Sequence, residues 1–143
     1  MEETTLQQTE MLSVAQKNFS EYARTHDPKF IAEDAVFKNF SSGEEHKGRA
    51  EIGAMLHYMY HVAFDAKPEV TNLIITENKA VLEGFFRGRH IGEFAGIAPT
   101  NKQVNVPLCV TYSLKNGLIQ EGHIFMLADV LFRQIGARPA AAM

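Results

Sequence analysis

A histidine at the end of an apolar strand is the first candidate for chemistry. His90 follows Leu82 and Phe86 in a segment that predicts a strand, and two arginines precede it in the string RGRH. Side chains alternate between the two faces of a strand, so His90 shares the apolar face and the arginines point the other way. If that face lines a pocket, His90 can act as a general acid or base near neutral pH. The alternative is a histidine that bonds a backbone carbonyl in the following turn.

The last predicted strand supplies possible partners for His90. Its alternating set runs from Ile119 through Glu121 and His123 to Asp129, and these residues are expected to share one face. A carboxylate bonded to an imidazole fixes its tautomer and raises its basicity. Asp129 can therefore form a proton-transfer pair with His123 or, across the sheet, with His90. In the alternative interpretation, Asp129 caps a final helical turn, VLFRQIG.

Two histidines on a predicted helix have the spacing of metal ligands. His57 and His61 are four residues apart, but the glutamate of the H-E-x-x-H motif is missing. We therefore expect no metal site, and solvated or dimer-facing histidines instead. Cys109, the single cysteine, excludes an intramolecular disulfide and lies in an apolar run, where a nucleophilic role is not expected.

Aromatic and methionine side chains are numerous enough to line a pocket for a flat, polycyclic or terpenoid-like ligand. The candidates for this lining are Phe37, Phe40, Met55, Met59, Phe86 and Phe125. In the alternative interpretation, the same residues form an ordinary core. His46 lies in the loop SSGEEHKG and is a further candidate, placed to close the mouth of the pocket.

Hydrophobic spacing predicts the elements that must position these residues. Helices are expected over residues 6–23, 27–34 and 49–64, the second because Asp27 followed by Pro28 is typical of a helix start. AVFKNF predicts a short strand. Longer strands are expected over residues 70–76, 79–91, 103–115 and 118–128, with a hairpin turn at Asn116-Gly117. This order indicates an α+β fold, with three helices packed on a strongly curved, mainly antiparallel sheet that encloses a pocket.

Length and composition indicate one domain with a small-molecule ligand. The chain has 143 residues, of which 45% are hydrophobic, and a net charge of -3. We expect a single domain over residues 1–136 and a flexible tail over 137–143. Without basic clusters, nucleic acid and anionic membranes are not expected partners. The acidic N-terminus does not have the pattern of a signal peptide, and no apolar stretch approaches membrane-spanning length, so we expect a cytoplasmic protein.

Five strings of the sequence follow one another in an order typical of a known family. They are AEDAVF, HKGRAEIGAML, RHIGEFAGIAPTNKQV, NGLIQEGHIF and DVLFRQIG. Together they cover most of residues 20–136 and resemble the SnoaL-like polyketide cyclases, or ester cyclases, a branch of the NTF2-like superfamily. The resemblance implies a homodimeric cone with a hydrophobic pocket and no metal or organic cofactor.

The same resemblance implies a reaction. SnoaL-like cyclases close a ring by an intramolecular aldol step on a polyketide ester, with a histidine and an aspartate as acid/base groups. Here these would be His90 and Asp129, supported by His123. The sequence departs from the family pattern at this point, because His123 stands where the family tends to have tryptophan and Asp129 comes later than the family's aspartate.

The leading hypothesis is a cofactor-independent cyclase or isomerase, of the lyase or isomerase class, that acts on a hydrophobic carbonyl compound. Two alternatives stay open, because one fold hosts many functions. The first is a non-catalytic dimer that binds a small molecule. The second is a dehydratase or epoxide hydrolase on the same cone.

Overall fold

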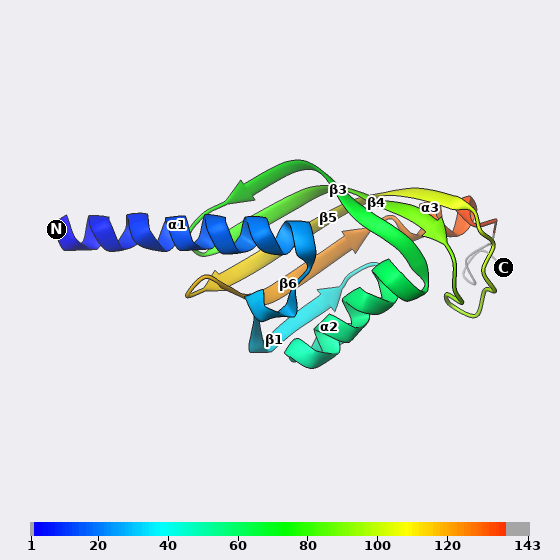
Figure 1. Ribbon diagram of the computed structural model, residues 1–143, viewed down its shortest axis with the longest axis horizontal. Helices are drawn as coiled ribbons and strands as arrows, with labels where there is room; N and C mark the ends of the chain where they lie inside the picture. The colour runs from blue at the N-terminus through cyan, green and yellow to red at the C-terminus, as the bar shows by residue number, and fades with distance from the viewer. Residues whose placement is uncertain (1, 137–143) are drawn as a thin grey trace.

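A long helix covers one side of a curved sheet. The computed structural model describes residues 2–136, with side chains from residue 7 onward, so the predicted tail 137–143 lies outside the described residues. α1 (Glu2–Thr25) buries Ala15, Phe19 and Tyr22 at the spacing predicted for its apolar face. The C-terminal half of α1 lies across the sheet, whereas its N-terminal half extends beyond it (Figure 1).

The predicted second helix is wrong beyond its first turn. η1 (Pro28–Phe30) is a single 3-10 turn, and Asp27 caps it as expected by accepting a backbone N–H at 3.0 Å. β1 (Ile31–Asn39) begins directly afterwards. The side chain of Ile31 is fully buried and the residue pairs with Ile119 of the last strand. Tertiary pairing therefore overrides a strong local helix start.

The predicted third helix ends in a wider turn. α2 (Arg49–His57) continues as the π-helical η2 (Tyr58–Val62), and β3 (Phe64–Ile75) follows after one residue. β3 therefore begins well before residue 70, where a strand was expected. Short π-helical segments are frequent at functional sites, and this one carries part of the cavity wall described below.

The remaining strands are β2 (Glu45–Lys47), β4 (Lys79–His90), β5 (Gln103–Lys115) and β6 (Leu118–Met126). The six strands form one sheet in the order β2-β1-β6-β5-β4-β3, in which β1 is parallel to β6 and every other pair is antiparallel. Asn116 and Gly117 have positive φ and join β5 to β6 in the predicted two-residue turn. The expected fold, helices packed on a curved, mainly antiparallel sheet, is confirmed (Figure 1).

A bulge in β6 decides which of its side chains face the helices. Ser113 pairs with Glu121 and Leu114 pairs with Ile119, so Gln120 is an extra residue between them. An extra residue reverses the alternation of the strand. The predicted common face of Ile119 and His123 is therefore wrong: Ile119 lies in the core, whereas Glu121 and the odd-numbered residues after it lie on the outer face of the sheet.

A final helix closes one end of the sheet. α3 (Ala128–Gln134) confirms the expected helical turn, and the Gln134 amide exchanges two hydrogen bonds, of 2.7 and 3.0 Å, with the backbone of Asn105 on β5. The residue at the N-cap is Leu127. The prediction that Asp129 caps this helix is therefore wrong, because the helix begins one residue before it.

Candidate active site

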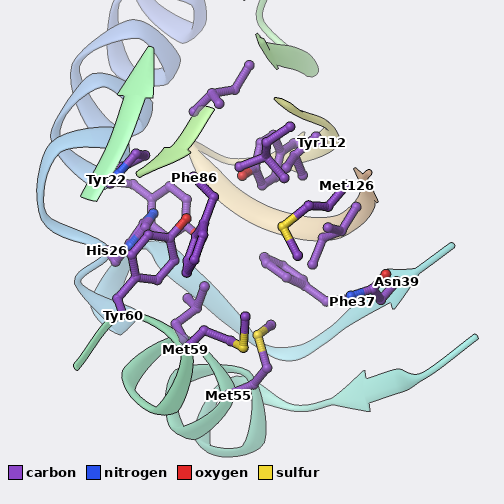
Figure 2. Close-up of a pocket in the computed structure, with 16 residues that line it drawn as sticks. Tyr22, His26, Phe37, Asn39, Met55, Met59, Tyr60, Phe86, Tyr112 and Met126 are labelled. Carbon is purple, nitrogen blue, oxygen red and sulfur yellow. The ribbon is translucent and has the colours of Figure 1, made fainter. Parts of the chain in front are cut away.

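A cavity lies between the concave face of the sheet, α2 with η2, and the end of α1 (Figure 2). Most of its wall is aromatic, aliphatic or thioether. It is lined by Tyr22, His26, Phe37, Asn39, Met55, Leu56, Met59, Tyr60, Pro68, Leu82, Phe86, Leu108, Val110, Tyr112, Ile124 and Met126. Four of the predicted ligand-binding residues, namely Phe37, Met55, Met59 and Phe86, belong to this lining.

The volume of the cavity limits the size of a ligand. It is about 70 Å³, whereas pockets for drug-sized molecules usually measure about 300–1,000 Å³. A polycyclic skeleton does not fit this space. Met55, Met59 and Met126 line it, and because unbranched thioether side chains change conformation readily, we expect this wall to adapt to a ligand with a single ring.

Five polar side chains interrupt the apolar wall. They are Tyr22, His26, Asn39, Tyr60 and Tyr112. The His26 ring centroid lies 4.6 Å from that of Tyr60 and 5.3 Å from that of Tyr22. Figure 2 shows these three rings together at one end of the cavity and Asn39 at the opposite end. The cavity therefore has two separate polar ends with an apolar middle.

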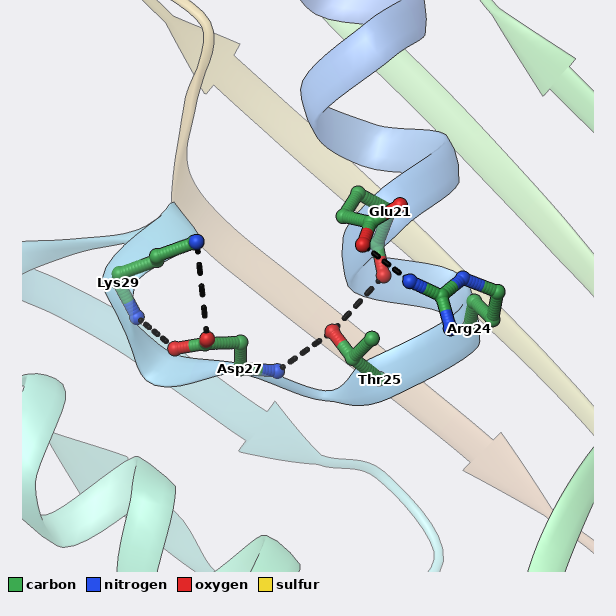
Figure 3. A network of polar contacts seen from close by, with 5 residues as sticks. All are labelled: Glu21, Arg24, Thr25, Asp27 and Lys29. Atoms are coloured by element: carbon green, nitrogen blue, oxygen red, sulfur yellow. Dashed lines mark hydrogen bonds and ion pairs between the residues drawn. The ribbon is translucent and has the colours of Figure 1, made fainter.

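A polar turn fixes the position of His26. The residue follows α1 in the left-handed conformation, with φ of 55°, and its N–H donates to the Tyr22 carbonyl at 2.7 Å. Thr25 Oγ1 donates to the Glu21 carbonyl at 2.9 Å and accepts from the Asp27 N–H at 3.1 Å (Figure 3). These bonds on both sides of His26 hold the backbone in place and direct the imidazole to the cavity.

His26 is an uncharged base at neutral pH. Burial, together with a smaller effect of the nearby His61, lowers its pKa from 6.5 to about 4, because a low-dielectric environment and a second imidazolium both disfavour the charged form. His26 also borders an outer groove that it shares with His61. The ring therefore stands in the wall between the cavity and the outside.

The three tyrosines of the cavity are hydrogen-bond donors. Burial raises the pKa of Tyr22, Tyr60 and Tyr112 well above the usual value, so their hydroxyls keep their protons. The Tyr60 hydroxyl makes no hydrogen bond to another described side chain or backbone group. A neutral imidazole beside protonated phenols can accept a proton at one atom and stabilise a developing oxyanion at another.

A glycine of β6 makes room for the floor of the cavity. A Cβ on Gly122 would lie 3.0 Å from the ring of Phe37, so this position admits the ring only because it has no side chain. Phe37 then reaches Tyr112 with a centroid separation of 6.0 Å in edge-to-face geometry. The close approach lets Phe37 form part of the aromatic wall of the cavity, on the side of Asn39 and Met126 (Figure 2).

His90 lies outside the cavity, and its side chain binds the loop that contains Thr100. It shares the apolar face of β4 as predicted and is fully buried, with its ring 5.2 Å from that of Phe64. Nδ1 accepts a hydrogen bond from the Thr100 N–H at 3.1 Å, so Nε2 carries a proton. Within the described residues Nε2 has no hydrogen-bond partner. The Thr100 hydroxyl oxygen also lies 3.0 Å from Nδ1. The described partners of the His90 ring are thus the N–H and the hydroxyl of Thr100, and not the carbonyl expected in the alternative interpretation.

The structure does not bring His90, His123 and Asp129 together. His123 lies on the outer face of β6 with Nε2 3.1 Å from Glu121 Oε1, a hydrogen bond that lowers the pKa of Glu121. Asp129 is exposed on α3, 3.8 Å from the guanidinium of Arg133. None of the three lines the cavity. The two predicted proton-transfer pairs with Asp129 are therefore not formed.

Three predicted ligand-binding residues also lie elsewhere. Phe40 and Phe125 stack at 4.9 Å on the outer face of the sheet, because the bulge in β6 turns Phe125 away from the cavity. His46 lies on β2, with ring nitrogens 3.6 Å from Glu44 and 3.7 Å from Glu51. These positions correct the expectation that the three residues line the pocket or close its mouth.

The other titratable candidates form no cluster around the cavity. His57 and His61 lie side by side with ring centroids 5.3 Å apart. Among the side chains that the structure describes, residues 7–136, no group of three or more His, Cys, Asp or Glu is placed to hold a metal ion. Cys109 is a half-buried free thiol on β5.

Sequence reasoning missed the polar end of the cavity. Hydrophobic spacing in residues 6–23 explains Tyr22 as part of the apolar face of the first helix, and none of the motifs considered for chemistry contains His26. A signal was present, because His26 comes four residues after Tyr22 and continues the same helical face. Tyr60 and Tyr112 carried no comparable signal, since only the tertiary fold brings η2 and β5 to the same cavity.

Comparison with known proteins places the chain in a family. The model of the SnoaL-like polyketide cyclases matches residues 13–135. No protein in the set with curated function matches the sequence. Within residues 2–136, no helix has the length and apolar character needed to cross a membrane.

Several solved structures share the fold. A SnoaL-like protein from Jannaschia sp. CCS1 has a TM-score of 0.77 at 16% identity, over 90% of this chain and 96% of that chain. A phenazine biosynthesis-related protein from Pseudomonas aeruginosa has a TM-score of 0.75 at 14% identity, over 94% and 93%. A protein with a ketosteroid isomerase-like fold from Catenulispora acidiphila, in complex with trimethylamine, has a TM-score of 0.70 at 14% identity, over 89% and 95%. At these identities the likeness concerns the fold, and the match of the family model over most of the chain shows that this protein belongs to the SnoaL-like polyketide cyclase family.

Proposed function

We propose that this protein is a cofactor-independent acid/base enzyme that acts on a small carbonyl compound held in the cavity. One observation carries the proposal: an uncharged imidazole, His26, borders an apolar cavity beside three protonated phenols. The family supports the same class of chemistry, because its name describes cyclases of polyketides. The catalytic base in this proposal is His26, which the sequence did not indicate.

The reaction begins with removal of a proton from the carbon next to a carbonyl. His26 accepts the proton, and the electron pair of the broken C–H bond moves into an enolate whose oxygen carries the negative charge. The Tyr60 hydroxyl donates a hydrogen bond to that oxygen, with Tyr22 and Tyr112 as neighbouring donors. Protonated phenols in a low-dielectric site stabilise such an oxyanion more than water does.

The fate of the enolate decides between cyclisation and isomerisation. In an aldol closure its carbon attacks a second carbonyl of the same molecule, and the new alkoxide takes the proton back from His26. In an isomerisation the proton returns to a different carbon. Both reactions use the same residues. A general base with a pKa of about 4–5 is strong enough for such carbon acids in other enzymes, so the lowered pKa of His26 fits this role.

The size of the cavity points to a substrate with one ring or a short chain. A volume of about 70 Å³ excludes the polycyclic ligand expected from the sequence unless the wall opens widely. His90, His123 and Asp129 have no part in the proposed reaction, since none of them lines the cavity. Their catalytic role stays a prediction, which variants of His90 and Asp129 test for two of the three residues.

A second candidate function is binding without chemistry. It is favoured by the lining of the cavity, which includes no Asp or Glu among the described residues, whereas the family's acid/base chemistry was expected to use an aspartate. The expected homodimer is compatible with both candidate functions. Phe40, Phe125 and Leu127 are exposed on the outer face of the sheet, and a second copy packed there would bury them.

Hydrogen–deuterium exchange tests the proposed proton removal without knowledge of the natural substrate. Phenylacetone has one ring and an activated CH2 next to its carbonyl, and its exchange in D2O is followed by proton NMR. We expect wild-type protein to accelerate exchange and His26→Asn to lose about 10²- to 10⁴-fold of that acceleration. Asparagine is chosen because it tolerates the left-handed conformation of residue 26.

His57→Asn is the matched control, since His57 is exposed and does not line the cavity. It should exchange at the wild-type rate. Equal losses in both variants, or no acceleration by wild-type protein, would contradict the proposal. Binding of phenylacetone without exchange would support the second candidate instead.

A further inference from the structure

We infer that Asn39 is a specificity residue, whose side-chain N–H2 binds a second hydrogen-bond acceptor of the substrate at the end of the cavity opposite His26. This inference rests on the proposed function and narrows its substrate class. The substrate is then a small molecule with a reactive carbonyl at one end and an ether, ester or second carbonyl oxygen at the other.

The backbone of Asn39 is held firmly at the end of β1. Its N–H donates to the Glu44 carbonyl at 2.8 Å, and its carbonyl accepts from the Gly43 N–H at 2.8 Å. The next residue, Phe40, donates its N–H to the Ile124 carbonyl of β6 at 2.9 Å. Because the backbone is held in place, the Cβ of Asn39 has a fixed position, as a specificity residue requires.

Two backbone amides orient the side chain of Asn39. Its Oδ1 accepts hydrogen bonds from the Ser41 N–H at 2.9 Å and from the Ser42 N–H at 3.2 Å. Only an oxygen can accept from two N–H groups, so these bonds identify which terminal atom is the oxygen and which is the nitrogen. The orientation of the amide follows from the turn itself and needs no ligand.

The amide nitrogen is left for a ligand. Asn39 lines the cavity, and Figure 2 shows its nitrogen on the side toward Phe37 and Met126 and its oxygen on the far side. Nδ2 donates to no other described residue. Its neighbours in the wall are apolar, so an acceptor supplied by the substrate would meet a donor with no competing protein partner.

The two ends of the cavity then recognise different groups. His26 and Tyr60 meet the reacting carbon and carbonyl, while Asn39 meets an acceptor that does not react. The lining between these two ends is almost entirely apolar, which suits a ring or a short hydrocarbon segment. A substrate that lacks the second acceptor would leave the amide unpaired and would bind less tightly.

Two matched compounds test the inference. 4-Methoxyphenylacetone and 4-ethylphenylacetone have nearly the same shape and differ by one ether oxygen in place of a CH2. Binding is measured by titrating protein labelled with 13C at its methionine methyl groups, because Met55, Met59 and Met126 line the cavity. We expect wild-type protein to prefer the methoxy compound by about fivefold, the worth of one hydrogen bond.

Asn39→Asp is the decisive variant. It keeps an oxygen to accept from Ser41 and Ser42 but has no N–H2, so it preserves the turn and removes the donor. We expect it to lose the preference for the methoxy compound while its affinity for the ethyl compound stays within about twofold. A preference unchanged in Asn39→Asp would show that the residue is only structural and would overturn the inference.

The wild-type titration separates the inference from the proposed function. If both compounds bind equally and exchange of phenylacetone is intact, Asn39 is not a specificity residue and the proposed function stands. If neither compound shifts any methionine methyl signal, the cavity does not take such ketones, and both proposals are wrong.

Discussion

His26 and His90 are both histidines in apolar surroundings, yet their environments prepare them for different tasks. His90 is fully buried, and one ring nitrogen accepts a backbone N–H from Thr100. His26 borders a cavity, and its ring contacts Tyr22 and Tyr60. The sequence favours His90 because this residue ends an apolar strand and belongs to RHIGEFAGIAPTNKQV, one of the strings that resemble the family. The structure favours His26 because a ligand can reach it.

A histidine on the apolar face of a strand does not necessarily line a ligand-binding cavity. Residues on the concave side of β4 share one face, but only Leu82 and Phe86 line the cavity. His90 lies further along the same face, where the ring of Phe64 covers it. Availability for chemistry therefore depends on the position along the strand as well as on strand parity.

The largest expected effect on stability concerns His90. His90→Ala leaves a hole in the core and removes the acceptor of the Thr100 N–H, so we expect the free energy of unfolding to fall by about 3–5 kcal/mol. His90→Asn keeps an oxygen near the position of Nδ1, so its free energy of unfolding should fall by less. Urea unfolding measures both variants. A His90→Ala protein of unchanged stability that fails to catalyse exchange would reverse the roles of the two histidines.

Acid should destabilise the protein through His26. Its pKa is about 4 in the folded protein and about 6.5 when unfolded, so between these values the unfolded state binds more protons. Stability is then fully present above pH 6.5 and falls as pH decreases toward 4, by about 3 kcal/mol in total. Urea midpoints measured from pH 7 to pH 4 check this, and His26→Asn should show a flatter dependence. Parallel pH curves for the two proteins would argue against a buried neutral His26.

Removing one phenol should have a moderate effect on activity. Tyr60→Phe deletes a hydroxyl that is expected to donate to the enolate oxygen, and Tyr22 and Tyr112 remain close by. We expect exchange of phenylacetone to slow by about tenfold, less than the full value of an isolated oxyanion donor, with little change in affinity for the ketone. If Tyr60→Phe raises the dissociation constant of phenylacetone by a larger factor than it slows exchange, Tyr60 contributes to binding of the ground state rather than to stabilisation of the enolate.

The smallest effect is expected at Asp129. Its carboxylate is exposed and paired with Arg133 on the helix surface, a contact that contributes less than about 0.5 kcal/mol. Asp129→Asn should therefore leave the exchange rate and the unfolding midpoint almost unchanged. Loss of exchange in this variant would restore the role that the sequence suggested for Asp129 and would challenge the assignment of the reaction to the cavity.

Much of the fold follows from local sequence patterns. Helix spacing places α1 and α2, alternation places β4 and β5, and Asn116-Gly117 marks the hairpin. The failures have physical causes. Pairing of Ile31 with β6 overrides a helix start, and one extra residue, Gln120, reverses the face of β6. Patterns within one segment do not encode either effect.

The candidate site was less predictable than the fold. Phe37, Met55, Met59 and Phe86 could be found as apolar lining because aromatic and methionine side chains suit the wall of such a cavity. The polar end depends on Tyr60 and Tyr112, which meet only through tertiary packing, and on His26, whose lowered pKa is a property of burial. Motif resemblance directed attention to residue types known from the family, and these lie elsewhere in this chain.

The pH dependence of exchange tests the central claim most directly. With His26 as the base, the wild-type rate of phenylacetone exchange, corrected for the uncatalysed reaction and for the fraction folded, should rise with pH through an inflection near 4 and reach a plateau above about pH 5. His26→Asn should lack both the inflection and the plateau. An inflection near 6.5 in wild-type protein, retained in His26→Asn, would assign the base to another histidine and contradict the account.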